Sequence, residues 1–264
     1  MGRQIIYLSP HLDDVALSCG GLISRQILEE AEVLVVTVFA GRPPEGGVSD
    51  FAAGLHDRWG DSAHPVDRRT EEDRRALRLL RASSLHLGYP DAIYRSSHES
   101  FLYTSREDLF GALHPLDRAL ASKIANDIAA ISSPRWAMVY SPLAVGNHVD
   151  HQLVRNAMFE RRVPPHERVF YEDYPYVEQP GALTKVLERL GAMRWTSEVQ
   201  QFDESCLKRK IRAISAYRSQ ITTLFETEQA MALRVREYSR AIGPDPGFGE
   251  RYWRISAEDD RSPS

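Results

Sequence analysis

The fold is decided by residues 4–39, which read QIIYLSPHLDDVALSCGGLISRQILEEAEVLVVTVF. Residues 4–8 contain β-branched and aromatic side chains, and residues 32–39 form a nearly continuous apolar run, typical of a parallel strand covered on both faces. Residues 15–30, between these runs, carry apolar side chains at roughly helical spacing. The stretch therefore predicts a strand–helix–strand unit with a right-handed crossover, whose first loop lies at the carboxyl edge of the sheet.

The alternation of helix and strand continues along the chain. Its patterns predict further helices at 66–81, 117–131, 148–160, 205–220 and 226–242, and further strands at 84–87, 136–140, 169–174 and 251–255. Residues 40–64 are expected to form a long loop with one helical turn near 51–58, and residues 94–115 an irregular insertion. We therefore expect an α/β fold, with a Rossmann-like, mostly parallel sheet flanked by helices and an active site at the carboxyl edge of the strands.

Length and composition indicate an ordinary globular protein. The 264 residues suffice for one generous α/β domain or two small ones, and no linker-like segment favours a split. We expect a single domain over 1–264, with its core at about 4–160, less regular elements at 165–256 and a frayed tail at 257–264. Hydrophobic residues make up 42% and charged residues 27%, so a sizeable buried core is expected.

Charge and cysteine content narrow the function. The formal net charge of -4 is small and its signs are interspersed, which argues against nucleic acid and favours small-molecule or glycan substrates. Two distant cysteines, Cys19 and Cys206, exclude a disulfide scaffold and suit a cytoplasmic location. The apolar run at 5–8 is too short for a signal peptide or a membrane span. The oligomeric state stays open, homo-oligomers included.

Two clusters of polar residues each follow an apolar strand that ends in Ser-Pro. The first contains His11, Asp13 and Asp14, and the second contains His148 and His151. Because the carboxyl ends of parallel strands meet at one edge, both clusters can converge on one ion. Zinc commonly takes three protein ligands and leaves a position for water, which an uncoordinated carboxylate can deprotonate. The sequence therefore predicts a mononuclear metal-hydrolase site.

Some of these residues also have a simpler interpretation. An aspartate before a helix often caps it or complements its dipole, which would explain Asp13 and Asp14 but not the histidines beside them. The joint pattern therefore favours the metal site. Four isolated histidines are interpreted as structural or solvated: His56, His86, His98 and His166.

The two clusters resemble the motifs of the PIG-L/LmbE superfamily of zinc-dependent N-acetylglucosaminyl deacetylases. The family's His-Pro-Asp-Asp-Glu motif corresponds to residues 11–15, HLDDV, and its His-x-x-His motif to residues 148–151, HVDH. The likeness covers roughly residues 5–160, and the two motifs together are specific whereas either alone is weak. Further positions resemble the family: Gly20, Gly21, Arg69, Glu72, Ala76 and Asp91.

The resemblance implies a function and a role for each residue of the clusters. The implied roles are zinc ligands for His11, Asp14 and His151, general base for Asp13, and stabilisation or protonation of the tetrahedral centre for His148. Zinc makes its water more acidic and polarises an amide carbonyl, so the implied reaction is hydrolysis of an N-acetyl group. The expected partner is a small N-acetylglucosamine-type sugar or glycoconjugate, and the expected cofactor is Zn²⁺, with Fe²⁺ and Co²⁺ as alternatives.

The resemblance also bears on specificity. It makes Arg69 and Asp91 candidates for binding sugar hydroxyls, although Arg69 equally suits the charged face of a helix. Leu12 replaces the family proline and Val15 its glutamate, and neither is an implied ligand. We therefore expect altered substrate contacts and retained catalysis.

Two other functions remain open at this point. The same ligands would serve an amidase or esterase for a non-sugar acyl compound, because sugar-binding groups would lie in the unassigned stretches 40–64 and 92–115. The second is a non-catalytic, metal-binding Rossmann-like module. It lacks the support of a Gly-x-Gly-x-x-Gly loop, since His11 and the two aspartates stand where that loop would be.

Overall fold

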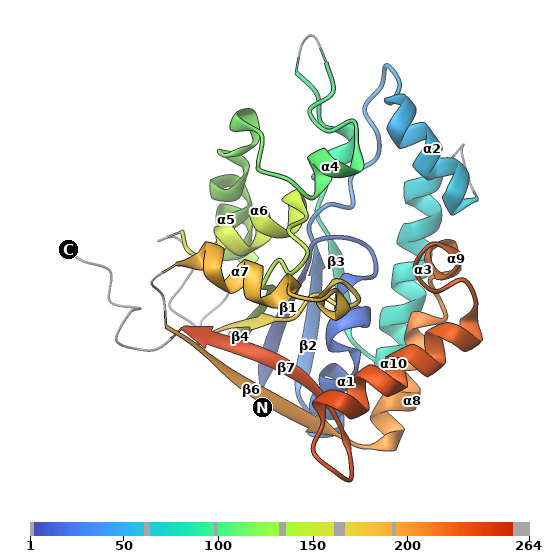
Figure 1. Cartoon of the computed structure of the whole chain (residues 1–264), viewed down its shortest axis with the longest axis vertical. Coiled ribbons are helices and arrows are strands. Elements are labelled where there is room, and N and C mark those ends of the chain that lie inside the picture. Colours follow the sequence, from blue (N-terminus) through green and yellow to red (C-terminus); the bar gives the residue numbers. More distant parts are fainter. Residues whose placement is uncertain are drawn as a thin grey trace, which may run out of the picture.

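The computed structural model describes residues 3–60, 64–97, 100–131, 136–160, 167–191 and 194–255, and it confirms the α/β fold (Figure 1). Within these residues one seven-stranded sheet has the order β3-β2-β1-β4-β5-β7-β6. The first five strands in this order are parallel, and β7 is antiparallel to both of its neighbours. The strands are β1 (Gln4–Ser9), β2 (Glu32–Thr37), β3 (Ser83–His86), β4 (Trp136–Pro142), β5 (Glu167–Tyr171), β6 (Trp195–Phe202) and β7 (Phe248–Ile255).

Strand β1 lies at the centre of the parallel part and sets its register. Ile6 pairs with Leu34 of β2 on one side and with Val139 of β4 on the other. Alternate side chains point to opposite faces of the sheet, so Tyr7 and Leu8 belong to two different hydrophobic cores. Burial on both faces explains why these strands read as continuous apolar runs.

Helices cover both faces of the sheet. Helices α1, α3 and α8 pack on the face of Tyr7, and α5, α6 and α7 on the opposite face, as Figure 1 shows. The α-helices are α1 (Asp14–Leu28), α2 (Asp50–Trp59), α3 (Pro65–Leu80), α4 (Arg106–Leu109), α5 (Leu120–Ile131), α6 (Val149–Ala157), α7 (Ala182–Leu190), α8 (Glu204–Ile214), α9 (Arg218–Phe225) and α10 (Glu228–Ile242). Short 3₁₀ turns add η1 (Ala92–Tyr94), η2 (Pro115–Asp117) and η3 (Tyr176–Glu178).

Several elements differ from the sequence predictions. The predicted turn near 51–58 is the ten-residue helix α2, which Ser49 caps by accepting a hydrogen bond from the Ala52 amide. The helix predicted at 205–220 is two helices, interrupted after Ile214. Helix α7 and strand β6 were not predicted. Strand β6 is mostly exposed, so it lacks the apolar alternation by which a strand is recognised.

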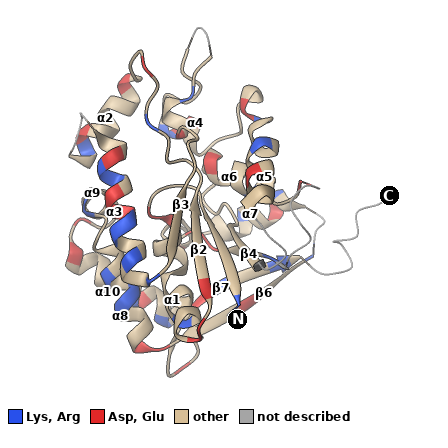
Figure 2. Cartoon of the chain, turned by 180° about the vertical axis from the view of Figure 1, so that it is seen from behind, with Lys and Arg blue, Asp and Glu red and all other residues tan. Residues whose placement is uncertain are grey.

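The remaining sequence expectations have these outcomes. Cys19 and Cys206 are buried and free. No helix in the described part of the chain is long and apolar enough to cross a membrane. Acidic and basic residues alternate along α3, as expected from interspersed charge (Figure 2). His98, His166 and the tail 257–264 lie outside the described residues.

Candidate active site

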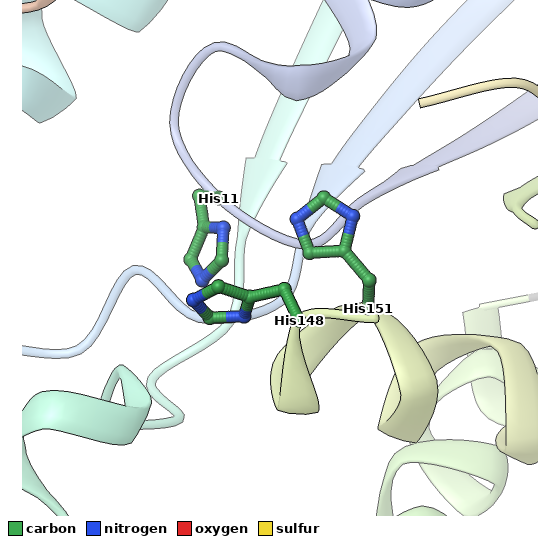
Figure 3. A group of neighbouring side chains, drawn as sticks. All are labelled: His11, His148 and His151. Atoms are coloured by element: carbon green, nitrogen blue, oxygen red, sulfur yellow. The ribbon is translucent and has the colours of Figure 1, made fainter. Parts of the chain in front are cut away.

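Three histidines meet at the carboxyl edge of the sheet (Figure 3). His11 stands in the loop after β1, whereas His148 and His151 stand at the start of α6, which follows β4. The ring centroid of His11 lies 4.8 Å from that of His148 and 5.2 Å from that of His151. One nitrogen of each ring lies within 4.8 Å of the others, so together they could hold a metal ion.

Asp14 joins two of these histidines. Its Oδ2 atom lies 3.2 Å from Nδ1 of His11 and 3.3 Å from Nε2 of His151. The same oxygen accepts a 2.7 Å hydrogen bond from the His11 amide. Burial opposes the charge of this carboxylate, but His151 and His11 hold its pKa well below the ordinary value. An ionised carboxylate oxygen thus lies within reach of two imidazole nitrogens.

The other nitrogen of each of these rings donates to a buried carboxylate. Nε2 of His11 lies 2.9 Å from Oδ2 of Asp150, and Nδ1 of His151 lies 2.6 Å from Oδ1 of Asp173. These bonds leave Nδ1 of His11 and Nε2 of His151 on the side of Asp14. Nε2 of His151 is buried and makes no hydrogen bond within the described residues. Paired carboxylates of this kind fix the ring orientation and the tautomer of metal-binding histidines.

Neither carboxylate was predicted from the sequence as part of the site. Asp150 accepts hydrogen bonds from the Ala92 amide and, at 2.5 Å, from Nη1 of Arg95. Asp173 follows β5 and accepts from the Val145 amide. Asp150 lies inside the His-x-x-His motif, where the need of a ligating histidine for a carboxylate partner could have identified it. No local pattern marks Asp173.

Asp13 begins α1 but does not cap it. It occupies the N-cap position, yet its side chain makes no capping hydrogen bond, so capping does not explain this residue. Its backbone φ of 147° lies in the region that favours glycine, and such strain is common at functional sites. Its carboxylate lies 3.8 Å from Nη2 of Arg69. Burial raises the pKa of Asp13 to about 7, although Arg69 opposes the shift.

His148 is the residue that caps α6. Its Nδ1 accepts a hydrogen bond from the Asp150 amide, so the neutral ring carries its proton on Nε2. Burial and the neighbouring charge of His11 hold the pKa of His148 well below its ordinary value. Stabilisation or protonation of the tetrahedral centre by His148 stays a prediction. A neutral ring remains a hydrogen-bond donor through Nε2.

Arg69 and Asp91 both line the cavity at these histidines. Arg69 is 8% exposed, its guanidinium carbon lies 4.6 Å from the Trp59 ring centroid, and Nη2 lies 3.4 Å from the Leu12 carbonyl oxygen. Because Arg69 is buried, the alternative interpretation, in which it belongs to the charged outer face of its helix, is wrong. Asp91 Oδ2 lies 3.7 Å from His11 Nε2.

Two isolated histidines have structural partners, as expected. His56 is buried and lies 2.7 Å from the Tyr94 hydroxyl, and His86 lies 2.7 Å from the carboxylate of Asp73. Neither belongs to the histidine cluster.

The site opens into a cavity of about 330 Å³. The two stretches that the sequence left unassigned supply much of its wall, through α2 and through residues 106–110 around α4. Both helices stand beyond the carboxyl edge of the sheet in Figure 1. Helix α9 and the segment 174–176 complete the lining. Their place around the cavity follows from tertiary packing and has no local sequence signal.

A family model described as PIG-L, GlcNAc-PI de-N-acetylase, matches residues 6–161. The chain belongs to the PIG-L family. It is therefore an amide hydrolase of the deacetylase type, and the resemblance of the two motifs is confirmed. A non-catalytic module is not supported.

Two curated PIG-L relatives are named 2'-N-acetylparomamine deacetylase. The protein of Niallia circulans is 31% identical over 190 residues, which are 67% of this chain and 69% of the relative. The protein of Streptomyces fradiae is 32% identical over 222 residues, which are 83% of this chain and 74% of the relative.

Solved structures extend the likeness over nearly the whole chain. The zinc-inhibited form of a teicoplanin deacetylase is 28% identical, with a TM-score of 0.81 over 96% of this chain and 97% of the other. The A40926 pseudoaglycone deacetylase is 27% identical, with a TM-score of 0.77 over 97% and 98%. The C-terminal elements beyond the family match therefore belong to the shared fold.

Proposed function

We propose that this protein is a metal-dependent hydrolase that removes the N-acetyl group of an N-acetylated amino sugar or glycoconjugate. The observation that carries the proposal is the position of Asp14 Oδ2, within 3.3 Å of His11 Nδ1 and His151 Nε2. The PIG-L relatives support the substrate class, because their names describe an N-acetylated paromamine and a teicoplanin.

The residues fit a zinc-type ion. Two imidazole nitrogens and one carboxylate, from His11, His151 and Asp14, are a ligand set that zinc takes in catalytic sites, with a position left for water. Asp150 and Asp173 supply the outer hydrogen bonds that such histidines need. The buried Nε2 of His151, without a hydrogen-bond partner among the described residues, supports the same assignment. Fe²⁺ and Co²⁺ suit these ligands too, so the active metal is a matter for measurement.

A bound divalent cation would polarise the amide carbonyl and make a neighbouring water more acidic. The chain then supplies the proton transfers. Asp13, with a pKa of about 7, accepts the proton of the attacking water and returns it to the departing nitrogen. Arg69 holds the Asp13 carboxylate from 3.8 Å.

His148 has a separate task in this scheme. Its Nε2–H donates a hydrogen bond to the oxygen on which negative charge develops, and Nδ1 is held by the Asp150 amide. Because Nδ1 accepts from the Asp150 amide, the proton of the neutral His148 ring is on Nε2, from which His148 can donate a hydrogen bond. Asp91, which lines the cavity, accepts a hydrogen bond from a hydroxyl group of the sugar.

The test combines metal analysis with a substrate panel. The protein as purified is analysed for Zn²⁺, Fe²⁺ and Co²⁺, stripped with a chelator and reloaded with each ion. Acetate release is then followed with phenyl N-acetylglucosaminide, N-acetylcyclohexylamine and phenyl acetate. We expect release from the sugar, its loss on chelation and its recovery on reloading.

Two results would contradict the proposal. Turnover of the amide or the ester but not of the sugar would reject the substrate class and favour the amidase or esterase. Less than about a tenth of an equivalent of metal, with none regained on reloading, would reject the metal site.

A further inference from the structure

The cavity has an apolar wall that begins at the histidine cluster, where the ring centroid of Phe110 lies 5.2 Å from that of His148, and continues along helix α2. Helix α2 contributes Phe51, Leu55 and Trp59, and Phe110 follows α4. The ring centroid of Tyr176 lies 5.6 Å from that of Phe110. A sugar presents mostly hydroxyl groups, which call for hydrogen-bonding partners. An aromatic wall of this kind suits a flat apolar group carried by the sugar.

Two exposed arginines border the same wall. Arg58 and Arg106 both line the cavity, and neither forms an ion pair with a carboxylate in the described part of the chain. By contrast, the exposed Arg78 on α3 is paired with Glu71 at 3.0 Å. The lining carboxylates belong to the metal end of the cavity: Asp13, Asp14 and Asp91. At the metal end Arg69 accompanies these carboxylates, whereas on α2 and α4 the charged residues among the described lining are Arg58 and Arg106.

Both arginines lie beside the apolar wall. The guanidinium carbon of Arg106 lies 5.4 Å from the Phe110 ring centroid. Arg58 follows Leu55 by three residues on α2, so the two side chains share a helix face.

We propose that the part of the cavity lined by α2 and by residues 106–110 is a subsite for the aglycone, and that it selects an aromatic aglycone with a carboxylate. The inference rests on the proposed deacetylase function and names the substrate class more closely. A guanidinium fork binds a carboxylate through two parallel hydrogen bonds and also stacks on aromatic rings. Arg58 and Arg106 would supply the fork, while Phe51, Trp59 and Phe110 pack against the ring.

The same charges disfavour a cationic aglycone. An ammonium group placed beside Arg58 and Arg106 would meet two like charges, and no carboxylate of α2 or α4 is among the described lining residues that could neutralise it. A divalent cation at the metal end would add to this repulsion, because it offsets the charge of Asp14 and Asp13.

The test measures binding separately from turnover. Three N-acetylglucosaminides that differ only in the aglycone are compared: phenyl, 4-carboxyphenyl and 4-aminomethylphenyl. Their dissociation constants are measured by calorimetry on metal-loaded Asp13→Asn protein, and their kcat/KM values on the active protein. We expect the carboxylate to bind about tenfold more tightly than the ammonium compound, with the neutral compound between them.

Substitutions of Arg58 and Arg106 test whether these residues cause the preference for the carboxylate compound. In R58Q/R106Q the two charged compounds should bind within about threefold of each other, with affinity for the neutral compound unchanged. In R58K/R106K part of the preference should remain, because the charge is kept and the fork is lost. R78Q is the matched control, an exposed α3 arginine outside the cavity, and should keep the full preference.

The outcomes separate the subsite from the deacetylase proposal. Equal binding of the carboxylate and ammonium compounds overturns the subsite even if all three are deacetylated. A preference that survives in R58Q/R106Q overturns the role of the arginines. Selective binding without hydrolysis of any glycoside overturns the deacetylase proposal and leaves the subsite supported.

Discussion

Asp173 accepts a 2.6 Å hydrogen bond from Nδ1 of His151, although it lies beyond β5 and His151 lies on α6. Both side chains are buried, and the second carboxylate oxygen of Asp173 accepts from the Val145 amide at 2.7 Å. Asp173 therefore fixes the His151 ring with Nε2 towards Asp14. Its effect on the proposed metal site is indirect, through the position and the tautomer of His151.

Asp173→Asn should weaken metal binding roughly 10- to 100-fold. The two carboxylate oxygens of Asp173 each accept a hydrogen bond, and asparagine offers only one oxygen for both donors. The measurement is competition with a chelator for Zn²⁺. The control is Glu172→Gln, which disturbs a buried carboxylate next in sequence that bonds Tyr238 and Trp253 instead. Equal loss of affinity in both variants would argue for general destabilisation.

Asp13→Asn should keep the metal and lower kcat by roughly 10²- to 10⁴-fold, because asparagine cannot accept the proton. His151→Ala should lose metal as well, since it removes a proposed ligand. Metal content and acetate release are measured on the same preparations. If both variants lose metal to the same extent, the assignment of Asp13 as the base and His151 as a ligand is wrong.

Those parts of the fold with local signals were predictable from the sequence. The unit β1–α1–β2 was predicted to within about two residues at its ends, because buried parallel strands read as apolar runs. The edge strand β6 was not, because its exposed side chains follow no apolar alternation. In the site, His11 likewise has a local sequence signal and Asp173 has none. His11 belongs to a motif, whereas Asp173 is recognisable only by the ring it contacts.

Asp150→Asn should lower the free energy of unfolding of the metal-free protein by about 3 kcal/mol. Asp150 is fully buried, and its loss of charge leaves Arg95 with Asp117 as its remaining carboxylate partner. The exposed pair of Arg42 and Asp67 provides the control, since Asp67→Asn should cost less than about 1 kcal/mol. Urea unfolding in the presence of a chelator measures the free energy of unfolding of both variants. Similar decreases in Asp150→Asn and Asp67→Asn would show that burial does not strengthen the contribution of Asp150.

The last prediction concerns Gly21, in the middle of α1. A Cβ atom added there would lie 2.4 Å from the Phe202 ring, and the Gly21 amide donates to the buried carboxylate of Glu250. Because the Phe202 ring is buried and stacks near the ring of Phe248, Gly21→Ala should destabilise the protein by about 1–3 kcal/mol despite alanine's better helix propensity.

Gly54→Ala is the matched control for that substitution. Gly54 is an exposed position in α2 where an added Cβ meets nothing within 4 Å, so alanine should stabilise the protein by about 0.5–1 kcal/mol. Thermal and urea unfolding of the two variants should therefore shift in opposite directions. A stabilised Gly21→Ala protein would show that Phe202 can move away. The glycine would then be explained by its backbone and not by the close approach of β6 to α1.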